Sequence, residues 1–224
     1  MKFKTVIFDL DGTMLNTLED LGKAVNHVLK KHGYPEKAID DYRYLIGNGA
    51  DNLIKSAAAG IMDGPEKNDM VTEFKNIYAQ TCTQSTYIYD GITELLDWMD
   101  DDNISYAVLS NKPHELTNKM INFYFPDKSF TAIIGEQTGN PKKPDPFCAN
   151  QIIKMFNCEA KETIFLGDSG VDMITAVNAG AFPVGVLWGF RERKELLDNG
   201  AALLIEHPEK LRQVICGEVD KSCL

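Results

Sequence analysis

Two carboxylates follow a short apolar run near the start of the chain. In the segment FDLDGT (8–13), Asp9 and Asp11 are two residues apart and precede Gly12. Side chains at positions i and i+2 of an extended chain lie on the same face, so both acids can point into one site. Gly12 allows a turn and close backbone approach to a ligand such as phosphate. The chain has 33 acidic residues, so a surface pair or a helix cap is the alternative.

Two further polar segments occur at places where strands are expected to end. Ser110 and Asn111 follow the run ISYAVL and can donate hydrogen bonds to an anion without adding charge. The segment GNPKKPDP (139–146) carries Lys142 and Lys143 between prolines, and we favour Lys143, directly before Pro144, as the functional lysine. An ordinary helix cap and a solvated loop are the respective alternatives.

A second pair of acids lies in GDSGVD, where Asp168 ends the run TIFLG and Asp172 follows four residues later. Acids gathered at one edge of a sheet repel one another unless a cation joins them. Oxygen ligands suit a hard ion, and Mg²⁺ is commonly shared between carboxylates and phosphate. The residues predict a phosphoryl-transfer site without a P-loop, because no GxxxxGK[ST] segment occurs. Its phosphate donors would be Ser110, Asn111 and Lys143.

These residues require a scaffold that brings several strand ends together. Apolar runs rich in β-branched residues alternate with helical patterns, which predicts right-handed crossovers and a parallel sheet. The fold class is therefore α/β, a doubly wound Rossmann-like sheet whose ligands bind beyond the carboxyl ends of the strands. The expected strands cover 3–9, 104–110, 132–135, 163–168, 182–189 and 201–206.

One long segment interrupts this alternation after the first strand. Residues 17–82 show helical patterns only, which predicts an α/β core of residues 1–15 and 84–224 with an all-helical cap of residues 16–83. Thr17 and Asp20 form a pattern typical of a capping box at the start of the first cap helix. Gly33 is expected to end that helix.

Charge and hydropathy narrow the class of protein. The formal net charge of −10 argues against a nucleic-acid partner, because phosphate backbones require basic surface. No run approaches the roughly 18 apolar residues of a membrane span, and the apolar N-terminal run is too short for a signal peptide. We therefore expect a cytoplasmic protein that acts on a small molecule, and the sequence leaves the oligomeric state open.

The segments DLDGT, LSN, KKPDP and GDSGVD resemble, in order, the four motifs of the haloacid dehalogenase superfamily, and the likeness spans the whole chain. The helical insert resembles the cap of that superfamily. The resemblance implies that Asp9 attacks phosphorus to form an aspartyl-phosphate. Asp11 would protonate the leaving oxygen and then activate water.

The same resemblance implies a metal site and a phosphate site. Mg²⁺ would be held by the carboxylates of Asp9 and Asp168 and by the backbone carbonyl of Asp11. Asp172 would support the metal site and Lys143 from behind. Ser110, Asn111 and Lys143 would hold the phosphoryl group during transfer.

Within the superfamily, the residues favour a phosphatase. A dehalogenase lacks the second acid, which is present here as Asp11, and Leu21 stands where β-phosphoglucomutase-like enzymes carry a cap histidine. A phosphonate hydrolase needs a cap lysine as nucleophile, and nothing singles one out. Pyrophosphate or another small phosphomonoester remains an alternative substrate. A phospho-accepting signalling domain is the alternative outside enzymes, although it would need neither the cap nor Asp11.

The cap contains a possible specificity segment, RYLIGNGADNL (43–53), which resembles the phosphoglycolate phosphatase pattern. The backbone N–H groups around Asn48, flanked by Gly47 and Gly49, could form an anion-binding concavity. Arg43 could bind a small carboxylate through two hydrogen bonds. A helix break and a surface salt bridge are the alternatives. This segment predicts 2-phosphoglycolate as the substrate.

Overall fold

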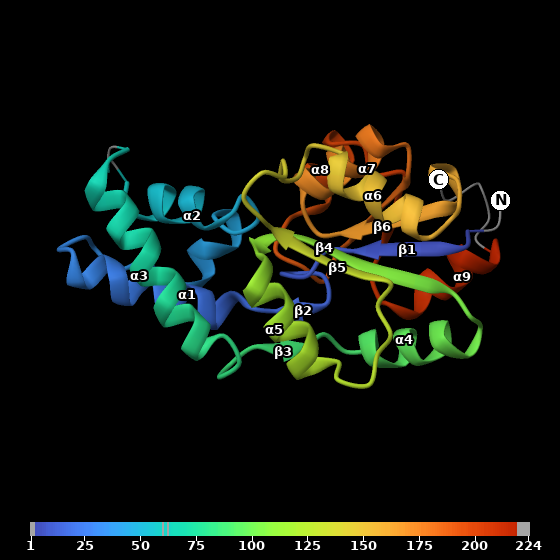
Figure 1. Ribbon diagram of the computed structural model, residues 1–224, viewed down its shortest axis with the longest axis horizontal. Helices are drawn as coiled ribbons and strands as arrows, with labels where there is room; N and C mark the ends of the chain where they lie inside the picture. Colours follow the sequence, from blue (N-terminus) through green and yellow to red (C-terminus); the bar gives the residue numbers. More distant parts are fainter. Residues whose placement is uncertain (1–2, 60, 62, 219–224) are drawn as a thin grey trace.

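The structure is a computed structural model that describes residues 3–59, 61 and 63–218. Its centre is a parallel sheet of six strands in the order β5-β4-β1-β6-β7-β8, so the predicted doubly wound α/β fold is confirmed (Figure 1). The strands are β1 (Thr5–Phe8), β4 (Ser105–Pro113), β5 (Ala132–Glu136), β6 (Thr163–Gly167), β7 (Phe182–Val186) and β8 (Leu203–Ile205). Among the described helices, none is both long and apolar enough to cross a membrane.

The central strand β1 is buried along its whole length, as its sequence TVIF predicts. It pairs with β4 on one side and with β6 on the other. Successive side chains of β1 alternate between two apolar clusters, with Ile7 in one and both Val6 and Phe8 in the other. Strand β1, which precedes Asp9, therefore lies between β4, which carries Ser110 near its end, and β6, which precedes Asp168.

Helices cover both faces of the sheet (Figure 1). One face packs against α6 (Phe147–Met155) and α7 (Gly170–Ala179), whose buried residues include Ile152 and Ala176. The other face packs against α4 (Ile92–Asp101), α5 (His114–Tyr124) and α9 (Glu209–Cys216). The short helix α8 (Arg193–Asp198) connects β7 to β8.

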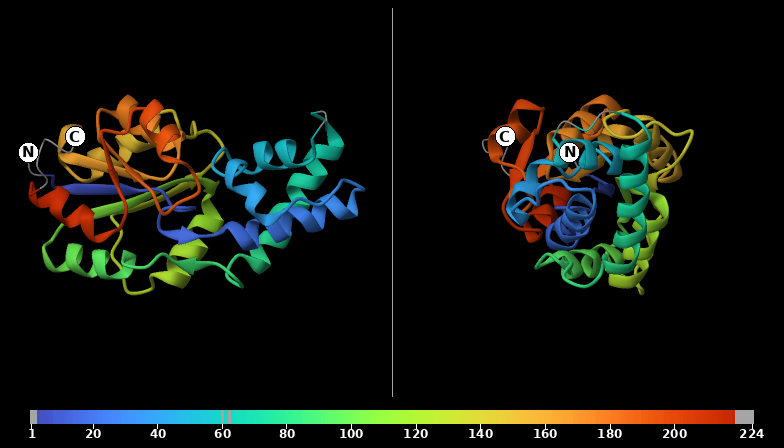
Figure 2. Two further views of the ribbon diagram at one scale, coloured as in Figure 1. Left: turned by 180° about the vertical axis from the view of Figure 1, so that it is seen from behind. Right: turned by 90° about the vertical axis from the view of Figure 1, so that its left-hand side faces the viewer.

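The segment between β1 and α4 is helical and extends beyond one end of the sheet, as Figures 1 and 2 show. It comprises α1 (Leu18–Lys31), the 3₁₀ helix η1 (Ile39–Tyr44), α2 (Ala50–Ala57) and α3 (Pro65–Thr81). The chain enters and leaves it through two short antiparallel strands, β2 (Leu15–Asn16) and β3 (Tyr87–Ile88). We call residues 16–83 the cap, and this division of the chain stays a prediction.

The predicted capping box at the start of α1 is wrong. Thr17 precedes the helix but makes no capping hydrogen bond, and its hydroxyl is buried without a partner among the described residues. The Asp20 carboxylate instead accepts hydrogen bonds from the backbone N–H groups of Ser85 and Thr86 and from the Thr86 hydroxyl. The Asp20 carboxylate thus binds backbone N–H groups 65 and 66 residues away and does not bind the N–H of Thr17 at the start of its own helix. Asp20 thereby ties the first cap helix to the segment that returns to the core.

Candidate active site

Asp9 lies immediately after β1, at the carboxyl edge of the sheet, and is only 6% exposed. The turn that follows requires glycine at position 12. Gly12 has a φ of +89°, and a Cβ atom there would lie 2.2 Å from Oδ2 of Asp168. The sequence DLDGT therefore lets the backbone after β1 pass directly beside the acid that follows β6.

Lys143 joins two acids at the base of the site. Its Nζ lies 2.6 Å from Oδ1 of Asp9 and 2.7 Å from Oδ1 of Asp172, and all three side chains are buried. Burial alone would lower the pKa of Lys143, but the carboxylates of Asp172 and Asp9 raise it above its ordinary value. The ammonium group therefore keeps its proton at neutral pH. The choice of Lys143 over Lys142 as the functional lysine stays a prediction.

The two carboxylate oxygens of Asp172 make different contacts. Oδ1 contacts Lys143, whereas Oδ2 accepts hydrogen bonds from the backbone N–H and the hydroxyl of Ser169, at 3.1 and 2.6 Å. The second set is a capping box at the start of α7. The capping box at the start of α7 thus fixes the Asp172 carboxylate, which in turn positions Lys143.

One oxygen from each of Asp9, Asp168 and Asp172 lies within 4.8 Å of the other two. Burial and repulsion from Asp172 raise the pKa of Asp9 to about 7, against the opposing effect of Lys143. Burial, Asp172 and Asp9 also raise the pKa of Asp168. Three buried acids thus face one ammonium group, a charge excess that a divalent cation would relieve. The oxygen-only donor set fits Mg²⁺, and Asp9 and Asp168 could hold it.

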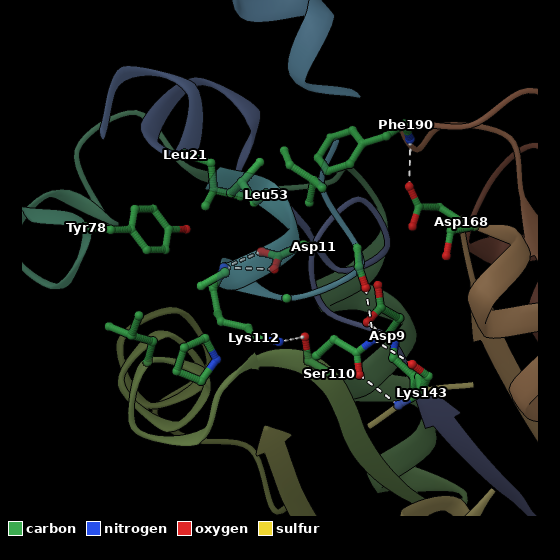
Figure 3. Close-up of a pocket in the computed structure, with 18 of the residues that line it drawn as sticks. Asp9, Asp11, Leu21, Leu53, Tyr78, Ser110, Lys112, Lys143, Asp168 and Phe190 are labelled. Atoms are coloured by element: carbon green, nitrogen blue, oxygen red, sulfur yellow. Dashed lines mark hydrogen bonds and ion pairs between the residues drawn. The ribbon is translucent and has the colours of Figure 1, made fainter. Parts of the chain in front are cut away.

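The Asp11 carboxylate stands apart from this trio and faces the cap. Both of its oxygens lie 2.8 Å from Nζ of Lys112, whose side chain is 3% exposed (Figure 3). The same ammonium group lies 4.7 Å from the centre of the Tyr78 ring, which belongs to α3 of the cap. The sequence analysis gave Lys112 no role. A signal was present, because Ser110 and Lys112 are two residues apart on β4 and can share a face.

Asn111 fixes the loop that carries Lys143. Its side-chain oxygen accepts a hydrogen bond from the backbone N–H of Lys143 at 2.9 Å, and its side-chain nitrogen donates to the Lys143 carbonyl at 3.0 Å. The same nitrogen donates to the carbonyl of Gly47 in the cap at 3.0 Å. Because both amide N–H groups are engaged, a side-chain contact from Asn111 to phosphate would require one of these bonds to open. Ser110 is buried and lines the pocket beside it.

The cap turn at residues 46–48 presents three successive carbonyls to the core. Arg191 donates to the carbonyl of residue 46 at 2.8 Å, Asn111 to that of Gly47, and Lys142 to that of Asn48 at 3.2 Å. Asn111 lies near the end of β4, whereas Lys142 and Arg191 belong to the loops that follow β5 and β7. Gly47 and Gly49 both have positive φ. The predicted anion-binding concavity would need N–H groups, whereas here the turn directs acceptors toward core donors.

The structure does not bring Arg43 into the pocket lining. Its side chain is 39% exposed and its Nε lies 3.4 Å from the Asp40 carboxylate. Gly47 and Gly49 line the pocket, whereas Asn48 does not. Arg191, whose side chain is 8% exposed, does line the pocket, and the sequence analysis did not identify it. No short motif marks it, since its place follows from the path of the loop after β7.

A single pocket between the cap and the core collects these groups (Figure 3). Its empty volume is about 640 Å³, part of which is open to solvent. Polar groups occupy the floor, and apolar cap side chains form the wall above Asp11. These apolar residues include Leu21, Leu53, Phe74 and Tyr78.

Comparison with known proteins places this geometry in a family. Residues 6–186 match the family described as haloacid dehalogenase-like hydrolase. The chain is 31% identical over 222 residues to the phosphoglycolate phosphatase of Pseudomonas fluorescens, covering 97% of this chain and 80% of that protein. It is 30% identical over 209 residues to phosphoglycolate phosphatase 1 of Pseudomonas aeruginosa, covering 91% of this chain and 76% of that protein.

A solved structure shows the same fold. The crystal structure of a candidate phosphoglycolate phosphatase from Lactobacillus delbrueckii subsp. bulgaricus superposes with a TM-score of 0.88 and 30% sequence identity. The match covers 96% of this chain and 99% of that one. The motif order, the fold and the matched family model agree, and the chain belongs to the haloacid dehalogenase-like hydrolase family.

Proposed function

We propose that this protein is a Mg²⁺-dependent phosphatase that hydrolyses a small phosphomonoester through an aspartyl-phosphate on Asp9, with 2-phosphoglycolate as the favoured substrate. The observation that carries the proposal is the position of Asp9. Its carboxylate lies at the floor of the pocket between cap and core, contacts Lys143, and has a second acid, Asp11, on the side where a leaving group would lie.

In the first step an oxygen of Asp9 attacks phosphorus, and the bond to the leaving oxygen breaks. Asp11 gives a proton to that oxygen, so the leaving group departs as an alcohol. In the second step Asp11 takes a proton from water, which attacks phosphorus and releases phosphate from Asp9. Lys143 offsets the negative charge at Asp9 throughout. A bound Mg²⁺ would supply the additional positive charge that brings a phosphate dianion next to the acids.

The substrate assignment is supported by the named activity of the relatives and by the size of the site. Asp9, Lys143 and the metal site act on the phosphoryl group, so the leaving group must be selected by other groups that line the pocket. Pyrophosphate and other small phosphomonoesters remain the alternatives. The cytoplasmic location and the lack of a nucleic-acid partner stay predictions.

The direct test is the rate of phosphate release from purified protein with Mg²⁺. A panel of small phosphate esters, pyrophosphate and an aryl phosphate should show turnover, with 2-phosphoglycolate at the highest kcat/KM. Asp9→Asn protein is the control and should be inactive. Release limited to one phosphate per protein would favour the signalling alternative, and a higher kcat/KM for another ester would replace the substrate.

A further inference from the structure

A buried cation on the pocket wall has no part in the phosphoryl-transfer steps described above. Lys112 lies at the carboxyl end of β4, and its side chain is 3% exposed. Its ammonium group contacts both oxygens of Asp11 and lines the pocket. The pairing with Asp11 offsets the cost of burying this ammonium group, and it also places the group beside the leaving-group side of the site.

The chemistry of Asp11 determines what must come close to Lys112. Asp11 donates its proton to the leaving oxygen, so that oxygen lies within hydrogen-bond distance of the Asp11 carboxylate during the reaction. Nζ of Lys112 is 2.8 Å from both Asp11 oxygens. A group one or two bonds beyond the leaving oxygen can therefore reach this ammonium group. A lysine has three N–H donors, and the two bonds to Asp11 leave one for another acceptor.

The surroundings of Lys112 favour a charged acceptor. Apolar side chains line the same pocket as Asp11 and Lys112, among them Leu21, Leu53, Tyr78 and Leu116. A carboxylate in such a space needs a cation, because burial of an unpaired charge is strongly unfavourable. An uncharged leaving group would gain much less from the same ammonium group.

The other cations near the pocket have different contacts. Lys143 contacts Asp9 and Asp172 at the floor. Arg191 also lines the pocket; its Nε lies 3.3 Å from Glu195, its Nη2 donates to the cap turn, and its buried Nη1 has no hydrogen-bond partner among the described residues. Arg43 does not line the pocket. Of the described cations that line the pocket, Lys112 is the one paired with Asp11, the proton donor to the leaving group.

We propose that Lys112 is a specificity-determining residue that binds a carboxylate on the leaving group of the substrate. This inference rests on the proposed phosphatase function and adds a residue to it. The substrate class is then a phosphate ester whose leaving group carries a carboxylate within one or two carbons of the ester oxygen. The choice between such substrates and uncharged esters is made in the core, on the strand that also carries Ser110.

The test compares two substrates of similar size, 2-phosphoglycolate and 2-hydroxyethyl phosphate, which differ in the charge of the leaving group. For the unaltered protein we expect the higher kcat/KM with 2-phosphoglycolate. Lys112→Met should reduce this preference on the order of 30- to 1,000-fold, chiefly by raising KM for 2-phosphoglycolate. Lys112→Arg, which keeps the charge, should retain part of the preference. Lys154→Met, on the exposed side of α6, is the matched control and should change neither substrate.

Because Lys112 also contacts Asp11, Lys112→Met could slow proton transfer for every substrate. A binding measurement removes this ambiguity. In Asp9→Asn protein, which does not turn over, adding Lys112→Met should weaken calorimetric binding of 2-phosphoglycolate and leave that of 2-hydroxyethyl phosphate within about threefold.

The outcomes separate the two proposals. Equal losses for both substrates in kcat/KM and in binding would overturn the role of Lys112 and leave the phosphatase intact. An unaltered protein that hydrolyses both esters without preference would also overturn it. An unaltered protein that hydrolyses neither ester would instead remove the proposed function.

Discussion

Asn111 and Gly47 are joined by a hydrogen bond of 3.0 Å that crosses from the core to the cap. The same Asn111 amide group bonds both the N–H and the carbonyl of Lys143. One side chain therefore connects the cap turn with the backbone of the lysine that contacts Asp9. Closure of the cap and placement of Lys143 are coupled through this amide.

Replacing Asn111 by Ala should lower both activity and stability. The change removes the hydrogen-bond partner of two buried backbone groups of Lys143, which typically costs about 1–3 kcal/mol of unfolding free energy for a buried group left unsatisfied. We expect a fall in kcat/KM for all substrates, because Lys143 is displaced. Urea unfolding and steady-state kinetics measure the two effects. Asn150→Ala, on the exposed surface of α6, is the control. Unchanged stability in Asn111→Ala protein would show that the amide is not needed to hold the loop.

Replacing Asp9 by Asn should abolish turnover and flatten the pH dependence of stability in the metal-free protein. The pKa of Asp9 rises from its ordinary value of 3.8 to about 7 on folding. Between these values the folded protein keeps a proton that the unfolded chain has lost. The contribution of Asp9 to the unfolding free energy is therefore greatest below pH 4 and is lost as the pH rises toward 7. Asp168 shifts in the same direction.

Urea unfolding in EDTA at several pH values from 4 to 8 measures this effect. The unaltered protein should lose more stability across the range than Asp9→Asn protein. If the two curves ran parallel, Asp9 would not carry a raised pKa in the folded state.

Replacing Asp11 by Asn should trap the phosphorylated protein. Substrates with good leaving groups need little help from a proton donor, so Asp9 should still be phosphorylated, whereas water is no longer activated. Mass spectrometry after addition of an aryl phosphate should show one added phosphoryl group on the peptide that contains Asp9. Equal phosphorylation of another residue would refute this division of labour between Asp9 and Asp11.

The sequence predicted the sheet and the floor of the site because strand ends in a parallel sheet meet by topology. Once β1, β4 and β6 are neighbours, Asp9, Ser110 and Asp168 must gather at one edge. The contacts between cap and core were not predictable in this way. Asp20 and Arg191 act through backbone groups more than 60 residues distant. Backbone N–H and C=O groups have no signature in the sequence, so such partners are found only from the fold.

Mg²⁺ should stabilise the protein through the acids at the floor of the site. Binding to the folded state alone raises the unfolding free energy by about 2.7 kcal/mol at a ligand concentration one hundred times Kd. Thermal melts with and without Mg²⁺ should show this increase, and Asp168→Asn should abolish it. Asp69→Asn, on the exposed side of α3, should retain it. Activity that survives exhaustive EDTA treatment would contradict the metal requirement.

Arg191, rather than Arg43, is expected to be the arginine on which activity depends. The side chain of Arg191 is 8% exposed, its Nη2 donates to the cap turn at 2.8 Å, and its guanidinium lies 5.6 Å from the ring of Tyr44. Among the residues that the structure describes, Arg43 has a polar contact with Asp40, and its side chain is 39% exposed. Surface ion pairs of this kind contribute at most about 1 kcal/mol.

Arg191→Met should therefore lower kcat/KM on the order of 10- to 100-fold, because the cap that excludes water from Asp9 closes less completely. The loss should be similar for 2-phosphoglycolate and for 2-hydroxyethyl phosphate, since Arg191 acts through the cap and not through the leaving group. Arg43→Met should change both by less than about threefold. A loss confined to 2-phosphoglycolate in Arg43→Met protein would restore Arg43 as the residue that grips the carboxylate, as the sequence pattern predicts. It would also mean that the cap reaches a second, more closed arrangement during the reaction.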